Sequence, residues 1–157
     1  MEIWENLSLE DMEGEVWKDI KGYEGLYQVS NMGRVKSLER FVNSPMLKDG
    51  RKKIESKILK QFNNQQGYLK VQLYKESISK YSFVHRLVAT AYIDNPINKP
   101  TVDHLNTIRN DNRVCNLKWA TQSEQAKENP ITNRKIREAQ KGVFVQTDYT
   151  GRCLLWH

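Results

Sequence analysis

The sequence predicts an α+β fold in which a small antiparallel β module precedes a strand–loop–strand–helix unit. Short alternating segments separated by glycine-containing turns fill the first half of the chain, as expected of small antiparallel sheets. Later, the Thr121-Gln122-Ser123-Glu124 tetrad matches a helix capping box directly after a predicted strand. The length of 157 residues fits one domain, or one small domain with appendages.

The first half reads as a succession of strands. Segments 27–30 and 34–37 flank the Asn31-Met32-Gly33 turn, which is a hairpin signal. Residues 48–60 are strongly basic around a Lys48-Asp49-Gly50 turn, so we expect an exposed loop or ribbon whose charges could follow a phosphate backbone.

The next elements are a hairpin and a short helix. Leu69, Val71 and Leu73 alternate with polar residues as a half-buried strand should, and a second strand follows at 81–84. Apolar residues at 84, 87, 88 and 91 then mark one face of a helix that ends before Asn95-Pro96. His85 at its start is interpreted as a structural residue rather than a catalyst.

Residues 102–129 carry the strand–loop–strand–helix pattern. We predict a strand at 102–104, a polar loop at 106–113, a returning strand at 114–119 and a helix at 122–129 that Pro130 stops. Beyond Pro130, a second short helical pattern carries basic residues, and segments 143–145 and 154–156 suggest a terminal hairpin.

The net charge of +6 is unevenly distributed along the chain. Residues 1–14 hold five acidic and no basic side chains, whereas the remainder carries +11. A body at +11 is compatible with polyanion binding, and equally with a merely soluble basic protein. The acidic lead segment either shields the basic surface or is disordered.

Cysteine usage and hydropathy exclude several classes. Cys115 and Cys153 form no C-x-x-C pair, which argues against a cysteine-based zinc site and a disulfide-stapled secreted fold. No apolar run is long enough to span a membrane, and the acidic N-terminus lacks the apolar region of a signal peptide. We expect a cytoplasmic protein that is not secreted and has no membrane partner.

The Asp103-His104 pair has the chemistry of phosphodiester hydrolysis. A carboxylate and nearby amide oxygens suit a hard divalent cation, and a neutral imidazole can take a proton from water. Adjacent strand residues point to opposite faces, so the pair can serve one site only at a strand end or a bulge. The pair alone is not specific for a nuclease.

Two longer segments resemble a known family. Residues 84–128, with VHRLVA, VDHLN and DNRVCNLKWAT, closely resemble the HNH endonuclease domain of phage homing endonucleases. Residues 15–38, EVWKDIKGYEGLYQVSNMGRVKSL, look like the β-rich nuclease-associated modular motif that precedes it. The resemblance implies a ββα-metal (HNH, His-Me finger) nuclease that hydrolyses a phosphodiester bond in duplex DNA with one Mg²⁺ or Mn²⁺ ion. One active site per monomer predicts that it nicks one strand.

The resemblance also implies roles for individual residues. Asp103 falls on the metal-ligand aspartate, and His104 on the general base. Asn116 falls on the middle asparagine, which braces the hairpin and orients the histidine. Gln125 falls where the family usually has a metal-ligating Asn or His. We expect DNA contacts from basic side chains of the β module and of the segment after Pro130: Arg34, Lys36, Arg51, Lys52, Lys53, Arg134 and Lys135.

Gln125 leaves three interpretations open. Its amide oxygen is kept but displaced by one methylene, and Mg²⁺ tolerates distorted octahedral geometry badly. The protein is active with a glutamine ligand, weakly active with relaxed metal choice, or inactive and retained as a DNA binder. We favour retained but reduced activity because Asp103, His104 and Asn116 are intact; Asn129, one turn along the helix, is a substitute ligand candidate.

The expected organisation has four parts: an acidic lead segment (1–14), a β-rich DNA-binding module with a basic loop (15–66), the HNH domain (67–130), and a basic helical segment with a terminal hairpin (131–157). We expect a monomer that binds double-stranded DNA, uses no small-molecule cofactor and works in a bacterial or phage-infected host cell. Related enzymes often continue into a helix-turn-helix module that adds sequence contacts. The given sequence ends near Trp156, about where such a module would begin, so we expect a shorter DNA footprint or looser specificity.

Two other classes compete with this interpretation. One is a DNA-binding protein whose nuclease activity is impaired or lost through Gln125. The other is a small basic RNA-binding protein, although stacking aromatics beside basic residues on a sheet face are not evident.

Overall fold

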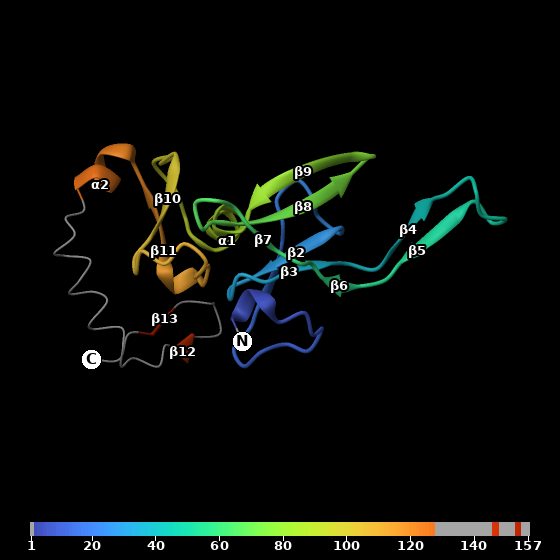
Figure 1. Cartoon of the computed structure of the whole chain (residues 1–157), viewed down its shortest axis with the longest axis horizontal. Helices are drawn as coiled ribbons and strands as arrows, with labels where there is room; N and C mark the ends of the chain where they lie inside the picture. Colours follow the sequence, from blue (N-terminus) through green and yellow to red (C-terminus); the bar gives the residue numbers. More distant parts are fainter. Residues whose placement is uncertain (1, 128–145, 148–152, 155–157) are drawn as a thin grey trace.

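The computed structural model describes residues 2–127, 146–147 and 153–154. Short helices and small antiparallel sheets alternate along this part of the chain (Figure 1). In chain order the elements are η1 (Ile3–Glu5), β1 (Trp17–Asp19), β2 (Tyr27–Ser30), β3 (Val35–Ser37), β4 (Arg40–Asn43), β5 (Arg51–Ile54), β6 (Lys57–Ile58), β7 (Phe62–Asn63), β8 (Leu69–Lys75), β9 (Ile78–Phe83), α1 (Val84–Tyr92), β10 (Thr101–His104), η2 (Val114–Asn116), β11 (Leu117–Ala120), α2 (Gln122–Lys127), β12 (Gln146–Thr147) and β13 (Cys153–Leu154).

The N-terminal sheet has the strand order β1-β2-β3-β6, with antiparallel neighbours. The predicted hairpin is confirmed: Val29 pairs with Val35, and both side chains are fully buried. Gly33 turns the chain between them with a φ of +86°, in the left-handed region that glycine adopts without steric strain.

The basic stretch forms a two-stranded ribbon, as the sequence predicts. β4 pairs with β5 from Arg40 opposite Ile54 to Asn43 opposite Arg51. In Figure 1 this ribbon projects away from the rest of the protein. Its charged side chains are therefore displayed on an extension rather than packed against the core.

The helix α1 lies at the centre of the core. Its buried residues Val84, Val88 and Ala89 join the apolar cluster formed by the sheets on either side, which includes Val29 and Leu73. It packs against β2, β8, β9, β10 and β11, so one helix supports both the β module and the β10–β11 hairpin. The predicted period of this helix and its end before Asn95-Pro96 are confirmed.

The predicted strand–loop–strand–helix order is present. β10 and β11 pair antiparallel from Thr101 opposite Ala120 to His104 opposite Leu117. The capping box at the start of α2 forms as predicted: the Glu124 N–H donates to Thr121 Oγ1 at 3.2 Å, and the Thr121 N–H donates to a Glu124 carboxylate oxygen at 2.7 Å. The mixed α+β fold class expected from the sequence is confirmed.

Some local expectations differ from the structure. The returning strand begins at Leu117 rather than at residue 114, because the Val114 N–H donates to the Asn31 carbonyl at 2.9 Å and residues 114–116 close a 3₁₀ turn. A C-terminal hairpin pairs β12 with β13. The basic segment after Pro130 and residues 143–145 fall outside the described residues, as does Asn129.

The acidic lead segment is part of the folded body. Trp4 packs against the core cluster, and the carbonyls of Ser8 and Glu10 accept hydrogen bonds from the Arg34 guanidinium at 2.7 and 2.9 Å. The expectation that this segment is disordered is therefore wrong for its described residues, 2–14. Within the described part of the chain, no helix is long and apolar enough to cross a membrane.

Candidate active site

Asp103 and His104 are the last two residues of β10, which places both side chains at a strand end as a shared site requires. The two side chains differ in exposure: Asp103 is partly exposed, while His104 is buried. One Asp103 carboxylate oxygen accepts the His104 N–H at 3.0 Å. The strand end thus presents a carboxylate to solvent and an imidazole to the interior.

The His104 ring is held on two sides. Its Nε2 lies 3.0 Å from Asn112 Oδ1, and its ring centroid lies 5.3 Å from His85 in an edge-on arrangement and 5.9 Å from Tyr68. Burial lowers the pKa of His104, although the hydrogen bond to Asn112 and the carboxylates of Asp103 and Asp111 act in the opposite direction. The imidazole is therefore neutral near pH 7, the state in which a histidine accepts a proton.

Asn116 holds the loop between β10 and β11. Its side-chain oxygen accepts the Asn106 N–H at 2.9 Å, and its Nδ2 donates to Asn106 Oδ1 and to the Asp111 carbonyl, both at 2.8 Å. These bonds match the brace that the resemblance implies. The hydrogen-bond partner of the histidine ring, however, is Asn112, which was not among the site residues predicted from the sequence.

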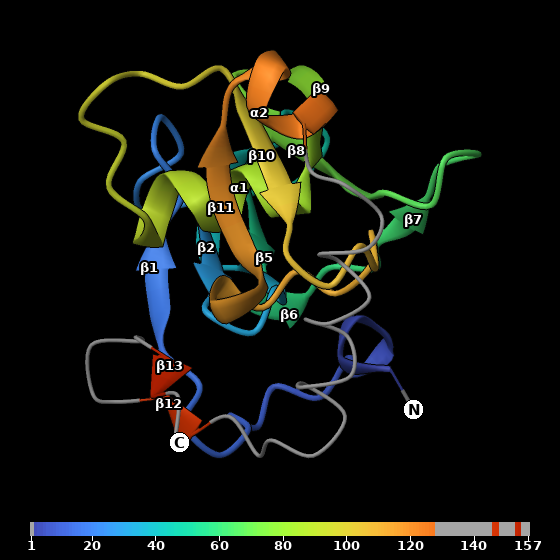
Figure 2. The same cartoon turned by 90° about the vertical axis from the view of Figure 1, so that its left-hand side faces the viewer.

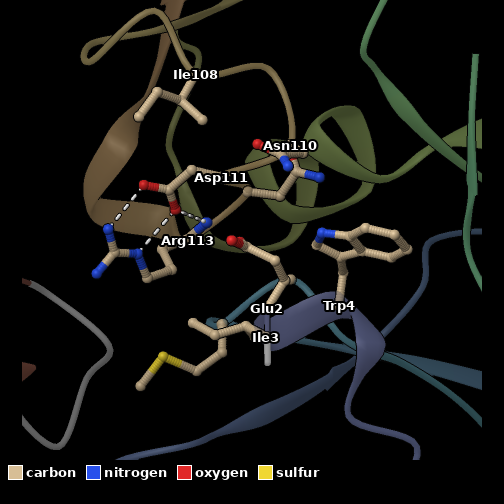
Figure 3. Close-up of a pocket in the computed structure, with 10 residues that line it drawn as sticks. Glu2, Ile3, Trp4, Ile108, Asn110, Asp111 and Arg113 are labelled. Atoms are coloured by element: carbon tan, nitrogen blue, oxygen red, sulfur yellow. Dashed lines mark hydrogen bonds and ion pairs between the residues drawn. The ribbon is translucent and has the colours of Figure 1, made fainter.

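Behind this loop lies a cavity of about 380 Å³ (Figure 3). Glu2 and Trp4 of the N-terminal segment face Asn110 and Asp111 of the loop across it. The Asp111 carboxylate is bound by the Arg113 guanidinium at 2.7 and 2.8 Å, and the pKa of Asp111 is lowered by this partner and its other hydrogen bonds despite burial. The acidic lead segment therefore lines one wall of this cavity, and the loop lines the opposite wall.

The donors available to a divalent cation are hard oxygen atoms. Asp103 offers a partly exposed carboxylate, and the Gln125 side chain is exposed on α2. Among the described residues, no three His, Cys, Asp or Glu side chains gather into a metal site. Because Mg²⁺ binds through one or two protein oxygens and keeps several waters, one carboxylate and one amide fit this ion.

The residues expected to contact DNA fall into different environments. Arg51 and Lys52 are exposed on β5, and Lys36 is half-buried with its Nζ 4.0 Å from the centre of the Trp17 ring. Lys53 is exposed but pairs with Glu39 and Glu55 at 3.0 and 3.1 Å. Arg134 and Lys135 lie outside the described residues.

The expectation for Arg34 must be corrected. Its side chain is fully buried and ion-paired with Glu15, and its remaining donors bind backbone carbonyls of the lead segment. No part of the guanidinium is left for a phosphate. Arg34 is a structural residue that ties residues 6–15 to the sheet.

A β-hairpin followed by a helix, with a histidine at the end of the first strand and an asparagine holding the connecting loop, defines the ββα class of nuclease domains (Figure 2). A family model described as the NUMOD4 motif matches residues 15–74. DNA endonuclease I-HmuI of Bacillus phage SP01 is 38% identical over 106 residues, covering 68% of this chain and 52% of that protein. An uncharacterized HNH endonuclease of Acanthamoeba polyphaga mimivirus, L247, is 34% identical over 143 residues, covering 88% of this chain and 31% of that protein.

A solved structure of the HNH homing endonuclease I-HmuI, described as showing DNA binding and cleavage, matches with a TM-score of 0.55 and 33% identity, covering 80% of this chain and 68% of that chain. The chain belongs to the HNH homing endonuclease family. It spans about half the length of I-HmuI and about a third of the mimivirus relative.

Proposed function

We propose that the protein is a metal-dependent endonuclease that nicks one strand of duplex DNA by hydrolysing a phosphodiester bond. The observation that carries this proposal is the His104 imidazole, held by Asn112 at a strand end beside the Asp103 carboxylate, in a family of homing endonucleases. Family membership supports the reaction class, and the geometry at the strand end supports the assignment of Asp103 and His104.

In the proposed reaction His104 accepts a proton from water. The water oxygen forms a bond to phosphorus, and the bond from phosphorus to the 3′ oxygen breaks, leaving a 5′ phosphate and a 3′ hydroxyl once solvent protonates that oxygen. Asn116 holds the loop between β10 and β11 in its folded conformation beside the histidine. One Mg²⁺ or Mn²⁺ ion, held by Asp103 and Gln125, would supply positive charge against the phosphate when bound.

We place the duplex along the β4–β5 ribbon. A two-stranded ribbon has a width that fits the major groove, and Lys48, Arg51 and Lys52 take part in no ion pair among the described residues. These cations would position the duplex by contacting its phosphates. Such contacts do not distinguish one base pair from another. The proposal includes a monomer acting in the cytoplasm of a bacterial or phage-infected cell.

A plasmid nicking assay tests the proposal. Supercoiled plasmid incubated with Mg²⁺ or Mn²⁺ should convert to the open circle with wild-type protein and not with His104→Ala or Asp103→Asn. Asp94→Asn removes an exposed carboxylate outside the site and should nick as wild type does. If wild-type protein binds the plasmid but yields no open circle with either metal, the proposed endonuclease activity is refuted.

A DNA-binding protein with a lapsed nuclease site is the second candidate. The position of Gln125 favours it, because a longer amide on the exposed face of α2 replaces the family's usual ligand. Binding without nicking by the wild type, together with nicking by Gln125→Asn, would establish this alternative.

A further inference from the structure

The side chain of Asn112 makes the hydrogen bond to the proposed base. Asn112 is 3% exposed, and its Oδ1 lies 3.0 Å from His104 Nε2. With Asn112 Oδ1 as the acceptor, Nε2 carries the proton of the neutral ring, and the buried Asn112 Nδ2 has no partner among the described residues. The lone pair that can accept a proton from water is therefore on Nδ1.

In the part of the chain that the structure describes, no second hydrogen-bond partner of the ring is found beside Asn112. Tyr68 and His85 contact the ring through aromatic faces and edges, with centroids 5.9 and 5.3 Å away. Such contacts restrict the tilt of the imidazole but do not distinguish Nδ1 from Nε2. Among the described residues, the choice of tautomer is thus made by Asn112.

Asn112 is in turn held by the β module. A Cβ atom added to Gly33 would lie 2.9 Å from Asn112 Cβ and 3.1 Å from its carbonyl oxygen, so the two backbones touch without space for a side chain. The neighbouring Asn31 carbonyl accepts the Val114 N–H at 2.9 Å, and the buried Gln61 Nε2 donates to the Gly33 carbonyl at 2.7 Å. These hydrogen bonds therefore hold the turn after β2 in place, and the turn contacts Asn112, the hydrogen-bond partner of the histidine.

We propose that Asn112 is the positioning residue for His104, selecting its Nε2–H tautomer, and that the turn at residues 31–33 of the β module fixes Asn112 in place. The proposal rests on the proposed endonuclease function. On this proposal the β module has a second role besides DNA binding, because its turn at residues 31–33 holds the residue that orients His104.

Four substitutions separate positioning from stability. Asn112→Leu keeps the approximate volume and removes the acceptor, Asn112→Asp keeps an oxygen at the same place, and Gly22→Ala is a control for Gly33→Ala, with φ of +82° and +86° but with open space at Gly22. Single-turnover nicking at saturating protein gives the rate constant, and gel retardation of the same plasmid gives DNA affinity.

We expect Asn112→Leu to lower the rate constant on the order of 100-fold while DNA affinity changes less than about twofold, because misplacing a general base removes most of its contribution. Asn112→Asp should recover most of the rate. Gly33→Ala should slow nicking and Gly22→Ala should not. A wild-type rate in Asn112→Leu would overturn the inference while leaving the endonuclease proposal intact; wild-type protein that does not nick would instead count against the proposed function.

The tautomer can be read without cleavage. Long-range ¹H–¹⁵N spectra of protein labelled at histidine distinguish the two neutral forms, and His85→Phe assigns the signals by difference. His104 should show the Nε2–H form in wild type and lose that preference in Asn112→Leu. The Nδ1–H form in wild-type protein would overturn the inference whatever the nicking rates are.

Discussion

His85 should make the fold sensitive to mild acid. The residue is 7% exposed on α1, between Tyr68, Phe83 and His104, and its Nδ1 has no partner among the described residues. Burial, followed by the positive charges of His104 and Arg86, lowers its pKa from 6.5 to about 3. A ring that stays neutral in the folded chain takes up a proton in the unfolded chain below pH 6.5.

The sign of the effect follows from this difference. Because the folded pKa lies below the unfolded one, the unfolded state binds more protons between the two values, and stability falls as the pH drops from about 6.5 toward 3. Between about pH 7.5 and pH 5 the loss from this one residue is about 2 kcal/mol. Burial lowers the pKa of His104 as well, which adds a loss of the same sign.

Urea unfolding followed by tryptophan fluorescence at both pH values measures this loss. His85→Phe keeps an aromatic ring beside Tyr68 and removes the titrating group. The fall in unfolding free energy on acidification should be about 2 kcal/mol smaller in the variant than in wild type. Titrating groups that do not contact His85 contribute equally to both proteins, so equal falls would refute the reasoning for His85.

Four further predictions follow from contacts already described. Gly33→Ala should destabilise the protein by about 2–4 kcal/mol in urea unfolding, and Gly22→Ala by only about 1–2, because both strain a left-handed backbone but only the former clashes; equal losses would exclude the clash. Arg34→Met should lower the unfolding free energy by about 3–5 kcal/mol, since it leaves a buried carboxylate unpaired, and an unchanged urea midpoint would contradict that. Gln125→Asn should raise the nicking rate at limiting Mg²⁺, shown by a metal titration, and a lower rate would indicate that the glutamine is the better ligand. Replacing Arg51 and Lys52 together by glutamine should reduce the salt dependence of DNA affinity by about two in log–log slope, whereas an unchanged slope would remove the ribbon from the interface.

Much of the fold could be predicted from the sequence because its signals are local. The capping box needs only Thr121 and Glu124, three residues apart, and both of its hydrogen bonds form. The β2–β3 hairpin follows from alternation around Gly33, and α1 follows from an apolar period over 84–91. Each of these patterns is contained in one short stretch of consecutive residues.

The environments of Arg34 and His104 could not be predicted in the same way. Next to a turn, Arg34 has the pattern of an exposed basic residue, and only the folded chain brings Glu15 and the lead-segment carbonyls around it. The loop after His104 contains several asparagines, and the sequence does not distinguish the one that reaches the imidazole. Asn112 is selected by its contact with Gly33, which lies 79 positions earlier and belongs to another sheet.

The hydrogen bonds of Arg34 bear on how such a module can move between genes. The matched family pattern starts at residue 15, yet the guanidinium takes acceptors from Ser8 and Glu10. A recombination junction placed at residue 15 would transfer the arginine without these acceptors. Buried N–H groups of the guanidinium would then have no hydrogen-bond partner in the recipient. The smallest exchangeable unit that keeps this interior satisfied therefore begins upstream of Ser8, and its lead segment must be inherited with the sheet.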